Sequence, residues 1–473
     1  MASNAGRISL ACTAPRGGLA CPLRGSRCCA LNLPCPPTPP LPERLPIEPL
    51  GGPVDFQIAV PGSKSITNRA LLMGALADGP VTLTGALFAD DPHFMLEALR
   101  TLGFDVETHP EEQTARVVGL GGRIPSPSAE LFVGNAGTAM RFLAAGLSVG
   151  RGHFRLDGNA RMRERPIRDL VDGLRNLGVA IRCEFDNGCP PVVLDADGLP
   201  GGHARLDGSR SSQYASAVLL AAPYAQEPLR VEVTGEFVSR PYVELTLHAM
   251  HDFGVETARD GDRIFLPAHG RRYRPGTYAV EGDASAATYF LALPAILGGR
   301  ATVTNLRADS AQGDAAFANL LERMGCRVRR GFLPGGFGVE VSREPHARLA
   351  PLEADLNDMP DVVQTLAAVA LFADGRSRFT RIANLRLKET DRLAALHHEL
   401  AHLGAEVQEG PDWLEVAPGR PCPADVKTYD DHRMAMALAL VGLARPGVTI
   451  LNPACVAKTY PRYFEDLTKL RHA

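Results

Sequence analysis

The sequence lacks any long apolar run, because no stretch reaches the roughly 18 to 20 unbroken apolar residues of a membrane-spanning helix. It also lacks an excess of charge of either sign: 50 basic residues stand against 53 acidic ones, and the formal net charge is −3. Such a balance favours neither nucleic acid nor an anionic membrane as a partner. Any affinity for anions must therefore come from local clusters of Lys and Arg.

The cysteines form no paired pattern. Half of the 10 lie in the first 35 residues, and the others are scattered without any CxxC pair: Cys183, Cys189, Cys326, Cys422 and Cys455. This spacing argues against a disulfide framework or a zinc ribbon, and it fits a reducing compartment.

The first 45 residues differ in composition from the rest. They contain no acid before Glu43, carry four arginines ahead of it (Arg7, Arg16, Arg24 and Arg27) and end in a proline-rich run from Pro34 to Pro46. An acid-free leader with arginines can be a transit peptide, but this one has few serines and no clear amphipathic helix. We therefore expect residues 1–45 to be a disordered leader, either an extension or a wrongly assigned start, and the protein to be cytoplasmic. The alternative is a transit peptide and a plastid location.

One short phrase recurs six times at a pitch near 74 residues. In each copy a small or polar turn opens directly into an apolar helix that ends just before a strand. The copies begin at Gly62, Gly134, Gly208, Gly282, Asn357 and Tyr429, at successive intervals of 72, 74, 74, 75 and 72 residues. A helix N-terminus carries unpaired N–H groups and partial positive charge, so six such termini predict a protein that holds small, multiply charged anions.

The segments between the phrases repeat as well. A strand-like run such as VTLTG or RVEVTG follows each apolar helix, and a second, amphipathic helix then ends on an apolar residue plus Gly, as at Leu102–Gly103. Two more short strands complete a βαβαββ unit of the α/β class. The first helix is apolar nearly all round, which predicts that it is buried on every side.

Six such units predict two domains of three units each. The chain stops early in the sixth unit, and we expect the unassigned strand Asp55–Val60 to complete it. The predicted domains are residues 46–62 with 282–473, and residues 63–281, with crossovers near Pro61–Gly62 and Glu281–Gly282. If the buried helices point the same way in both domains, their positive ends face each other across a cleft, where we place the active site.

Lys and Arg gather at several of the helix starts. GSKSITNRA places Lys64 and Arg69 at the first buried helix, and it is not a Walker P-loop because its Lys follows Ser. RMRERPI puts three arginines on one loop, and bidentate Arg donors suit phosphate and carboxylate. Each cluster alone is also compatible with a capped helix and solvated charges.

Carboxylates accompany the later clusters. NLRLKETDRL combines three cations with Glu389 and Asp391, and YDDHRMAMA puts Asp431 and Arg433 at the mouth of an apolar helix. In NDMPD, Asp361 begins another helix, where the helix dipole favours its charge or where it serves as a base.

The segment His398–His402 matches the HExxH signature of zinc metalloproteases. It lies on the amphipathic second helix of the fifth unit, whose counterparts in other units are surface structure, and no third ligand is evident. We expect no metal here.

Taken in order, these strings closely resemble the EPSP synthase family of enolpyruvyl transferases. The resemblance runs from about Ile47 to Leu470 and includes GSKSxxNRALL, GNAGTAMR, RMRERPI, GSRSSQ, FVSRPY, NLRLKETDRL, YDDHRMAMA and AKTYP. The fold that the resemblance implies is a two-domain inside-out α/β barrel of six βαβαββ repeats, three per domain.

The resemblance implies transfer of the enolpyruvyl group of phosphoenolpyruvate to the 5-hydroxyl of shikimate 3-phosphate, with release of phosphate. This reaction belongs to the shikimate pathway to chorismate and the aromatic amino acids, and the family is the target of glyphosate. The residues implied for shikimate 3-phosphate are Lys64, Ser65, Arg69, Ser211, Ser212, Gln213, Ser239, Tyr242, Asp361, Asn384 and Lys388. The residues implied for phosphoenolpyruvate are Lys64, Asn135, Gly137, Arg165, Gln213, Arg392, Arg433 and Lys458.

Three residues are implied to be catalytic: Asp361 as proton acceptor for the 5-hydroxyl, Glu389 as proton donor to the methylene carbon, and Lys64. No metal or organic cofactor is needed in this scheme, and a monomer with small anionic substrates is expected. The fourth phrase, GDASAAT, is expected to be structural. Phe142 stands where the family usually has Pro, a position linked to the glyphosate response.

Two alternatives remain. One is UDP-N-acetylglucosamine enolpyruvyl transferase, which shares the fold but relies on a loop cysteine and lacks the SKSxxNR and KETDR strings. The other is a non-enzymatic anion-binding protein of the same architecture, whose sequence mark is the loss of Asp361, Glu389 or Lys64; all three are present.

Overall fold

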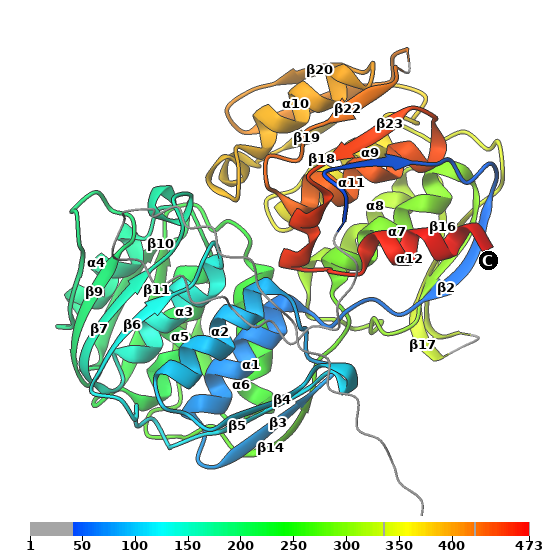
Figure 1. Cartoon of the computed structure of the whole chain (residues 1–473). Coiled ribbons are helices and arrows are strands. Elements are labelled where there is room, and N and C mark those ends of the chain that lie inside the picture. The colour runs from blue at the N-terminus through cyan, green and yellow to red at the C-terminus, as the bar shows by residue number, and fades with distance from the viewer. Residues whose placement is uncertain (1–40, 334–335, 421, 473) are drawn as a thin grey trace, which may run out of the picture. The chain divides into compact units, whose positions relative to one another are not determined.

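The computed structural model describes residues 41–333, 336–420 and 422–472 (Figure 1). Most of the predicted leader therefore lies outside the described residues. Within them, no helix has both the length and the apolar character needed to cross a membrane.

Each of the six phrases contains the predicted helix, and nearly every residue of these helices is buried. They are α1 (Lys64–Leu76), α3 (Gly137–Leu147), α5 (Gln213–Ala221), α7 (Ala284–Leu297), α9 (Val363–Ala370) and α11 (His432–Ala444). Each of these helices carries Ala, Leu or Val side chains on all sides, so the helices can pack against one another. They do so in two groups of three: α1, α3 and α5 in one, and α7, α9 and α11 in the other.

A second helix follows each buried one and keeps a polar face, as the sequence predicted. These helices are α2 (Asp90–Thr101), α4 (Arg168–Asn176), α6 (Pro241–Asp252), α8 (Phe317–Arg323), α10 (Arg392–His402) and α12 (Tyr463–Lys469). Gly103, just beyond α2, has a φ of +87°, the left-handed conformation that favours glycine after a helix end.

The strands form six small sheets, which confirms the βαβαββ repeat. The first sheet has the spatial order β14 (Gly276–Ala279), β3 (Pro80–Thr84), β5 (Thr114–Val118), β4 (Val106–His109). The order in the second sheet is β6 (Ser128–Phe132), β7 (Arg151–Asp157), β9 (Val192–Asp197), β8 (Ala180–Cys183). In the third sheet it is β10 (Gly202–Asp207), β11 (Leu229–Thr234), β13 (Ile264–Pro267), β12 (Thr257–Asp260). The fourth sheet has the order β2 (Val54–Ile58), β15 (Gly299–Val303), β17 (Gly336–Arg343), β16 (Arg327–Leu333). The order in the fifth sheet is β18 (Glu353–Asp355), β19 (Ser377–Thr380), β21 (Trp413–Ala417), β20 (Glu406–Glu409). The sixth sheet has three strands, β22 (Ala424–Val426), β23 (Val448–Leu451) and β1 (Arg44–Ile47).

Four of the sheets are built in the same way: the strand that leads into a buried helix pairs in parallel with the strand that leaves it, as β6 does with β7. In the other two sheets these partners are exchanged, because β14, which leads into α7, pairs in parallel with β3, and β2, which leads into α1, pairs in parallel with β15. The remaining strands of each sheet pair antiparallel, as β9 does with β7 and β8. Short 3-10 helices join several elements: η1 (Pro110–Glu112), η2 (Met162–Glu164), η3 (Ala222–Tyr224), η4 (Gly313–Ala316), η5 (Pro360–Val362), η6 (Ala383–Leu387), η7 (Pro453–Lys458) and η8 (Leu470–His472).

The strand at residues 55–60 does not complete the sixth sheet, so that prediction was wrong. β2 pairs in parallel with β15 in the fourth sheet, and β1 closes the sixth sheet by pairing antiparallel with β23. Arg44 and Leu45, which the sequence placed in the leader, are thus part of a sheet. The position beside β15 is open to β2 because β14, the strand that leads into α7, pairs with β3 in the first sheet.

Two hydrophobic cores result. The first core runs from Ile66 to Val280, and the second contains residues from Ile47 to Val60 together with those from Ala284 to Leu467. Gly62 and Gly282 pair in an isolated antiparallel bridge, so the two links between the cores run side by side. The predicted crossovers fall at these positions.

Candidate active site

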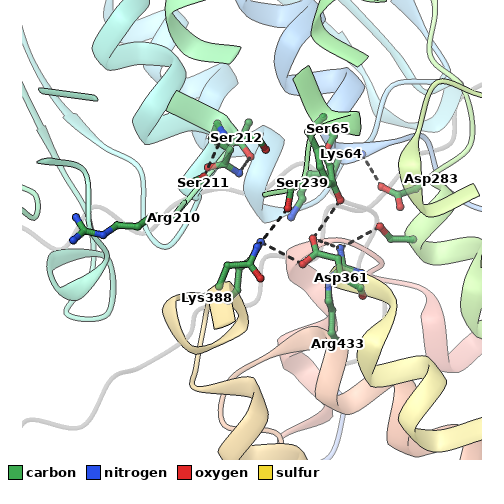
Figure 2. Close-up of a pocket in the computed structure, with 15 residues that line it drawn as sticks. Lys64, Ser65, Arg210, Ser211, Ser212, Ser239, Asp283, Asp361, Lys388 and Arg433 are labelled. Atoms are coloured by element: carbon green, nitrogen blue, oxygen red, sulfur yellow. Dashed lines mark hydrogen bonds and ion pairs between the residues drawn. The ribbon is translucent and has the colours of Figure 1, made fainter. Parts of the chain in front are cut away.

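One pocket is lined by residues from the chain segments that build the two cores (Figure 2). Its first wall comes from the starts of α1 and α5 and from the segment before α6; its second comes from the starts of α7, α9 and α11 and from the segment before α10. The lining residues are Lys64, Ser65, Thr138, Arg210, Ser211, Ser212, Gln213, Ser239, Tyr242, Asp283, Ser285, Asp361, Asn384, Lys388 and Arg433.

The start of α1 fixes Lys64. Ser63 is the N-cap, and its hydroxyl accepts a hydrogen bond from the backbone N–H of Ile66. The backbone N–H of Lys64 donates to Asp283 Oδ2 at 2.9 Å, while its Nζ pairs with Asp91 Oδ2 at 3.2 Å. Asp283 and Ser285 both lie in the fourth phrase and line the pocket, so this phrase, which we expected to be mainly structural, also contributes side chains to the pocket.

Asp361 is surrounded by cations. Arg392 Nη1 lies 3.1 Å and Lys388 Nζ 3.4 Å from its Oδ1, and Arg433 Nη2 lies 3.2 Å from its Oδ2. Figure 2 shows Lys388 and Arg433 converging on this carboxylate. Burial alone would raise the pKa of Asp361, but Arg433, Lys388 and Arg392 together hold it well below the usual value. The group is therefore ionised at neutral pH.

Arg392, the first residue of α10, joins three carboxylates although its side chain is only 1% exposed. Its Nε donates to Asp431 Oδ2 at 2.7 Å, and its Nη2 donates to Glu389 Oε2 at 2.9 Å. Burial opposes ionisation of Glu389, but Arg392, Arg165 and Lys458 lower its pKa well below the usual value.

The remaining residues predicted for phosphoenolpyruvate form a connected set beside the pocket. Arg165 Nη1 donates to both the carbonyl and the side-chain oxygen of Asn135 at 3.0 Å, and Lys458 Nζ donates to the same carbonyl at 2.8 Å. A Cβ at Gly137 would lie 2.6 Å from Arg165 Nη2, so a larger residue would require this guanidinium to move from its position. Lys458 also pairs with Asp91 at 2.7 Å, which links the set to Lys64.

Hydroxyl and amide groups form the other side of the pocket. Ser211, Ser212 and Gln213 lie where α5 begins, and Gln213 Nε2 donates to Thr138 Oγ1 at 3.3 Å. Ser239 has a φ of +54°, and its hydroxyl accepts from Asn384 Nδ2 at 3.4 Å, across the two walls.

Arg69 is not among the residues that line the pocket. It is buried, and its guanidinium donates to the carbonyls of Ser65 and Tyr242, each at 2.9 Å, and to Thr246 Oγ1 at 2.8 Å. Burial lowers its pKa to about 10. Its contacts are thus with the backbone of two residues that do line the pocket.

The ring of Phe142 lies beside the same guanidinium, with its centroid 5.1 Å from Arg69 Cζ. Phe142 is fully buried in the second turn of α3. A proline there would remove both the ring and a backbone donor.

The three arginines of the RMRERPI loop have separate partners. Arg161 donates from the first core to the carbonyl of Lys388 in the second wall at 2.9 Å, and Arg163 pairs with Asp157 at 2.6 Å. Of the three, only Arg165 contacts the residues predicted to bind phosphoenolpyruvate. Arg210, by contrast, points away from Asp361 in Figure 2 and lies 3.3 Å from Asp169.

A second carboxyl group lies close to Asp361. Asp314 accepts a hydrogen bond from the Ser285 hydroxyl, and the Tyr242 hydroxyl lies 3.4 Å from both Asp314 Oδ2 and Asp361 Oδ2. Burial, assisted by the charge of Asp361, raises the pKa of Asp314 to about 6. Neither Asp314 nor Asp91 belongs to a motif, so sequence reasoning had no signal by which to find them.

Replacing Asp314 by Asn should make stability less sensitive to pH. Because its folded pKa of about 6 exceeds the ordinary 3.8, the wild-type protein loses stability as the pH rises from about 4 to about 6. D314N lacks this loss, so its free energy of unfolding relative to wild type should rise by about 3 kcal/mol between pH 4 and pH 7. Urea unfolding at a series of pH values measures the difference.

Asp309 offers a matched control. It is exposed, and Arg307 lowers its pKa, so D309N should show no such rise. A constant difference between D314N and wild type across this pH range would contradict the raised pKa of Asp314.

Eleven of the predicted site residues line the pocket, six form the adjoining charged set, and Arg69 supports the wall from behind. The lining members are Lys64, Ser65, Ser211, Ser212, Gln213, Ser239, Tyr242, Asp361, Asn384, Lys388 and Arg433. The adjoining members are Asn135, Gly137, Arg165, Glu389, Arg392 and Lys458.

Fold and site together define an α/β protein of six repeats with a cation-rich pocket for small anions. The family model of EPSP synthase (3-phosphoshikimate 1-carboxyvinyltransferase) matches residues 50–467, so the chain belongs to this family. It is 44% identical over 428 residues to the 3-phosphoshikimate 1-carboxyvinyltransferase of Nostoc sp., covering 90% of this chain and 99% of that one. It is 47% identical over 420 residues to that of Serratia proteamaculans, covering 88% and 96%. A solved structure of EPSP synthase from Acinetobacter baumannii superposes with a TM-score of 0.74 at 25% identity, covering 90% and 98%.

Proposed function

We propose that this chain transfers the enolpyruvyl group of phosphoenolpyruvate to the 5-hydroxyl of shikimate 3-phosphate, giving 5-enolpyruvylshikimate 3-phosphate and phosphate. The reaction is a step of the shikimate pathway to chorismate and the aromatic amino acids. The observation that carries the proposal is an ionised carboxylate, Asp361, with a side chain only 14% exposed, in a pocket of hydroxyl, amide and cationic groups. Family membership over residues 50–467 supports the same activity.

The reaction proceeds by addition and elimination. The 5-hydroxyl oxygen bonds to C2 of phosphoenolpyruvate as its proton leaves, and a proton adds to C3, which gives a tetrahedral intermediate. The C2–O bond to phosphate then breaks and C3 loses a proton, which forms the new double bond. One base and one acid must stand at the reacting groups, and fixed cations must stabilise the phosphate and carboxylate charge.

Asp361 suits the role of base toward the 5-hydroxyl, since its low pKa leaves it unprotonated at neutral pH. Lys64 suits a role between the two substrates, because it lines the pocket and also pairs with Asp91 of the adjoining set. We assign the binding of shikimate 3-phosphate to ten of the residues that line the pocket: Lys64, Ser65, Ser211, Ser212, Gln213, Ser239, Tyr242, Asp361, Asn384 and Lys388. Arg69 supports this binding through its contacts with Ser65 and Tyr242. We assign the binding of phosphoenolpyruvate to Lys64, Gln213, Arg433, Asn135, Gly137, Arg165, Arg392 and Lys458.

Glu389 can donate a proton only after its pKa rises. Arg392, Arg165 and Lys458 hold it ionised, so an anion that binds to these cations should offset their charge and raise the pKa of Glu389. We expect phosphoenolpyruvate, added alone, to bind with uptake of up to about one proton near neutral pH. Calorimetry in buffers of different ionisation enthalpy measures the uptake.

The variant E389Q should bind phosphoenolpyruvate with less proton uptake and should lose turnover. Its shape is nearly unchanged, so a loss of binding is not expected. Equal proton uptake in E389Q and wild type would remove Glu389 from the role of donor.

Removing either of two cations should impair the use of phosphoenolpyruvate. Lys64→Ala and Arg165→Ala each delete one charged hydrogen-bond donor, and we expect kcat/KM for phosphoenolpyruvate to fall by about 100-fold or more. Steady-state kinetics with the other substrate saturating measures this. Arg163→Ala is the control, because Arg163 lies on the same loop but pairs with Asp157. Near-normal kcat/KM in both site variants would overturn the assignment.

Phosphate release from phosphoenolpyruvate and shikimate 3-phosphate, with pure folded protein, tests the function itself. Absence of turnover would overturn it. Replacing shikimate 3-phosphate with UDP-N-acetylglucosamine tests the related enolpyruvyl transferase activity, and we expect no release there. Binding of shikimate 3-phosphate without turnover would instead favour a non-enzymatic anion-binding protein.

Three further properties belong to the proposal. The chain acts as a monomer, which light scattering on the purified protein tests. Residues 46–62 with 282–473 and residues 63–281 move as two domains that close on the substrates and exclude water. The protein is cytoplasmic, or plastid-located if residues 1–45 act as a transit peptide, and N-terminal sequencing of the native protein distinguishes the two.

A further inference from the structure

We propose that His398, Glu399 and His402 on α10 form a binding site for a divalent transition-metal ion such as Zn²⁺. The three residues each offer one ligand atom, and these atoms all lie within 4.8 Å of one another. The two imidazole rings stand one helical turn apart, with centroids 4.2 Å from each other. The site is separate from the pocket described above and takes no part in the proposed reaction.

Glu399 is the third ligand that the sequence did not reveal. We had expected this stretch of helix to be surface structure, but the Glu399 side chain is fully buried. Its Oε2 accepts a hydrogen bond from the backbone N–H of Lys427 at 3.0 Å. Its Oε1 lies 2.8 Å from His398 Nδ1 and accepts from the Tyr429 hydroxyl at 2.6 Å. One oxygen is therefore anchored, and the other is held at the imidazole.

This arrangement suits a metal ion for three reasons. Imidazole nitrogen and carboxylate oxygen are ligands that Zn²⁺ takes in proteins, and three protein ligands leave a fourth position for water. The carboxylate supplies a negative charge that offsets part of the charge of the ion. Both His398 and His402 are exposed, so the ion can enter from solvent without opening the fold.

The same contacts argue against a metalloprotease centre. In an HExxH protease the Glu is not a ligand but a free general base. Here Glu399 is committed to Lys427 and Tyr429, which lie on the segment that leads to Asp431 and α11. We infer a site that binds the ion and ties the end of α10 to this segment, with no hydrolytic chemistry.

Metal binding by the full-length chain tests the proposal. Metal-free protein, kept reduced, is titrated with ZnCl₂ by calorimetry, and its thermal unfolding is followed with and without ZnCl₂. We expect saturable Zn²⁺ binding and a rise in the unfolding temperature, because an ion that binds only the folded state stabilises it. Since loss of even an outer-shell partner costs 10- to 100-fold in affinity, H398N/H402N should bind about 100-fold more weakly or not at all.

His397 provides the matched control. It lies on the same helix beside His398 but faces Glu409, 3.6 Å away, so H397N should bind Zn²⁺ as wild type does. Cys422 is exposed, and C422S separates thiol binding from imidazole binding. Titration with CoCl₂ adds a spectroscopic reading: the visible bands of bound Co²⁺ should appear in wild type, H397N and C422S, and be absent from H398N/H402N.

Two outcomes would overturn the site. One is the absence of saturable Zn²⁺ binding by the wild-type chain. The other is equal Zn²⁺ affinity in wild type and in H398N/H402N, since the ion would then be held elsewhere. Circular dichroism of the double variant shows whether it is folded, and loss of binding counts only if its spectrum and its turnover without metal match those of wild type.

Discussion

Asp361→Asn is expected to lower kcat by about 10²- to 10⁴-fold, the range that a positioned acid or base contributes. The amide keeps the size of the side chain but cannot take the proton of the 5-hydroxyl. The neighbouring cations retain other partners: Arg392 keeps Asp431 and Glu389, and Arg433 keeps the Ser285 hydroxyl at 3.2 Å. The variant should therefore fold, and stopped-flow phosphate release with both substrates saturating measures its residual rate.

Asp314→Asn is the matched control for this experiment. The Asp314 side chain is buried, and the Tyr242 hydroxyl lies within 3.4 Å of both Asp314 and Asp361. Unlike Asp361, Asp314 forms no salt bridge with a Lys or Arg side chain of the described residues. Loss of turnover confined to D361N would support the base. Equal rates in D361N and wild type would remove Asp361 from that role, whereas equal losses in both variants would point to damage of the wall as a whole.

The local parts of the fold were predictable because each rests on a short stretch of sequence. Apolar residues on every side of a helix indicate burial, whatever the helix packs against. The phrase from Gly134 therefore predicted α3, whose residues are all buried. The glycine after each of the first five second helices likewise marks a left-handed residue, as Gly103 shows.

The pairing of distant strands was not predictable in the same way. β2 alternates buried and exposed residues like any edge strand, and nothing in that pattern selects one sheet over another. Its place beside β15 follows from a strand exchange: β14, which leads into α7, pairs with β3, and this leaves the parallel position at β15 to β2, the strand that precedes α1. Only the assembled topology shows this.

The cations of the site were easier to find than their counter-charges. Lys64, Arg165 and Arg392 lie in the motifs GSKSITNRA, RMRERPI and NLRLKETDRL, where several charged residues stand close together in the sequence. Asp91 and Asp314 begin ordinary helical segments, and Lys458, the partner of Asp91, is 367 positions away in the chain. An isolated acid has no local pattern that reveals such a partner.

Arg392→Met is expected to have the largest effect on stability, about 3–5 kcal/mol in the free energy of unfolding. Met retains much of the aliphatic volume but leaves three carboxylates without their shared guanidinium. Glu389 keeps Lys458 at 3.8 Å and Asp361 keeps Arg433. Among the described residues, the Asp431 carboxylate keeps the backbone N–H of Arg433 at 2.9 Å and has His432 Nδ1 at 3.6 Å, but no other Lys or Arg side chain pairs with it. Because Asp431 is fully buried, its uncompensated charge should account for most of the loss.

Two comparisons separate this cause from a general loss of packing. Arg386→Met removes a guanidinium that also pairs with two carboxylates, Asp391 and Glu409, but whose side chain is 28% exposed, so we expect a loss of about 1 kcal/mol or less. In R392M/D431N the buried charge of Asp431 is removed together with its partner, and part of the lost stability should return. Urea unfolding of wild type, R392M, R386M and R392M/D431N measures the stability of each variant relative to wild type. If R392M were as stable as R386M, or if R392M/D431N were no more stable than R392M, the carboxylates around Arg392 would not depend on the charge of Arg392.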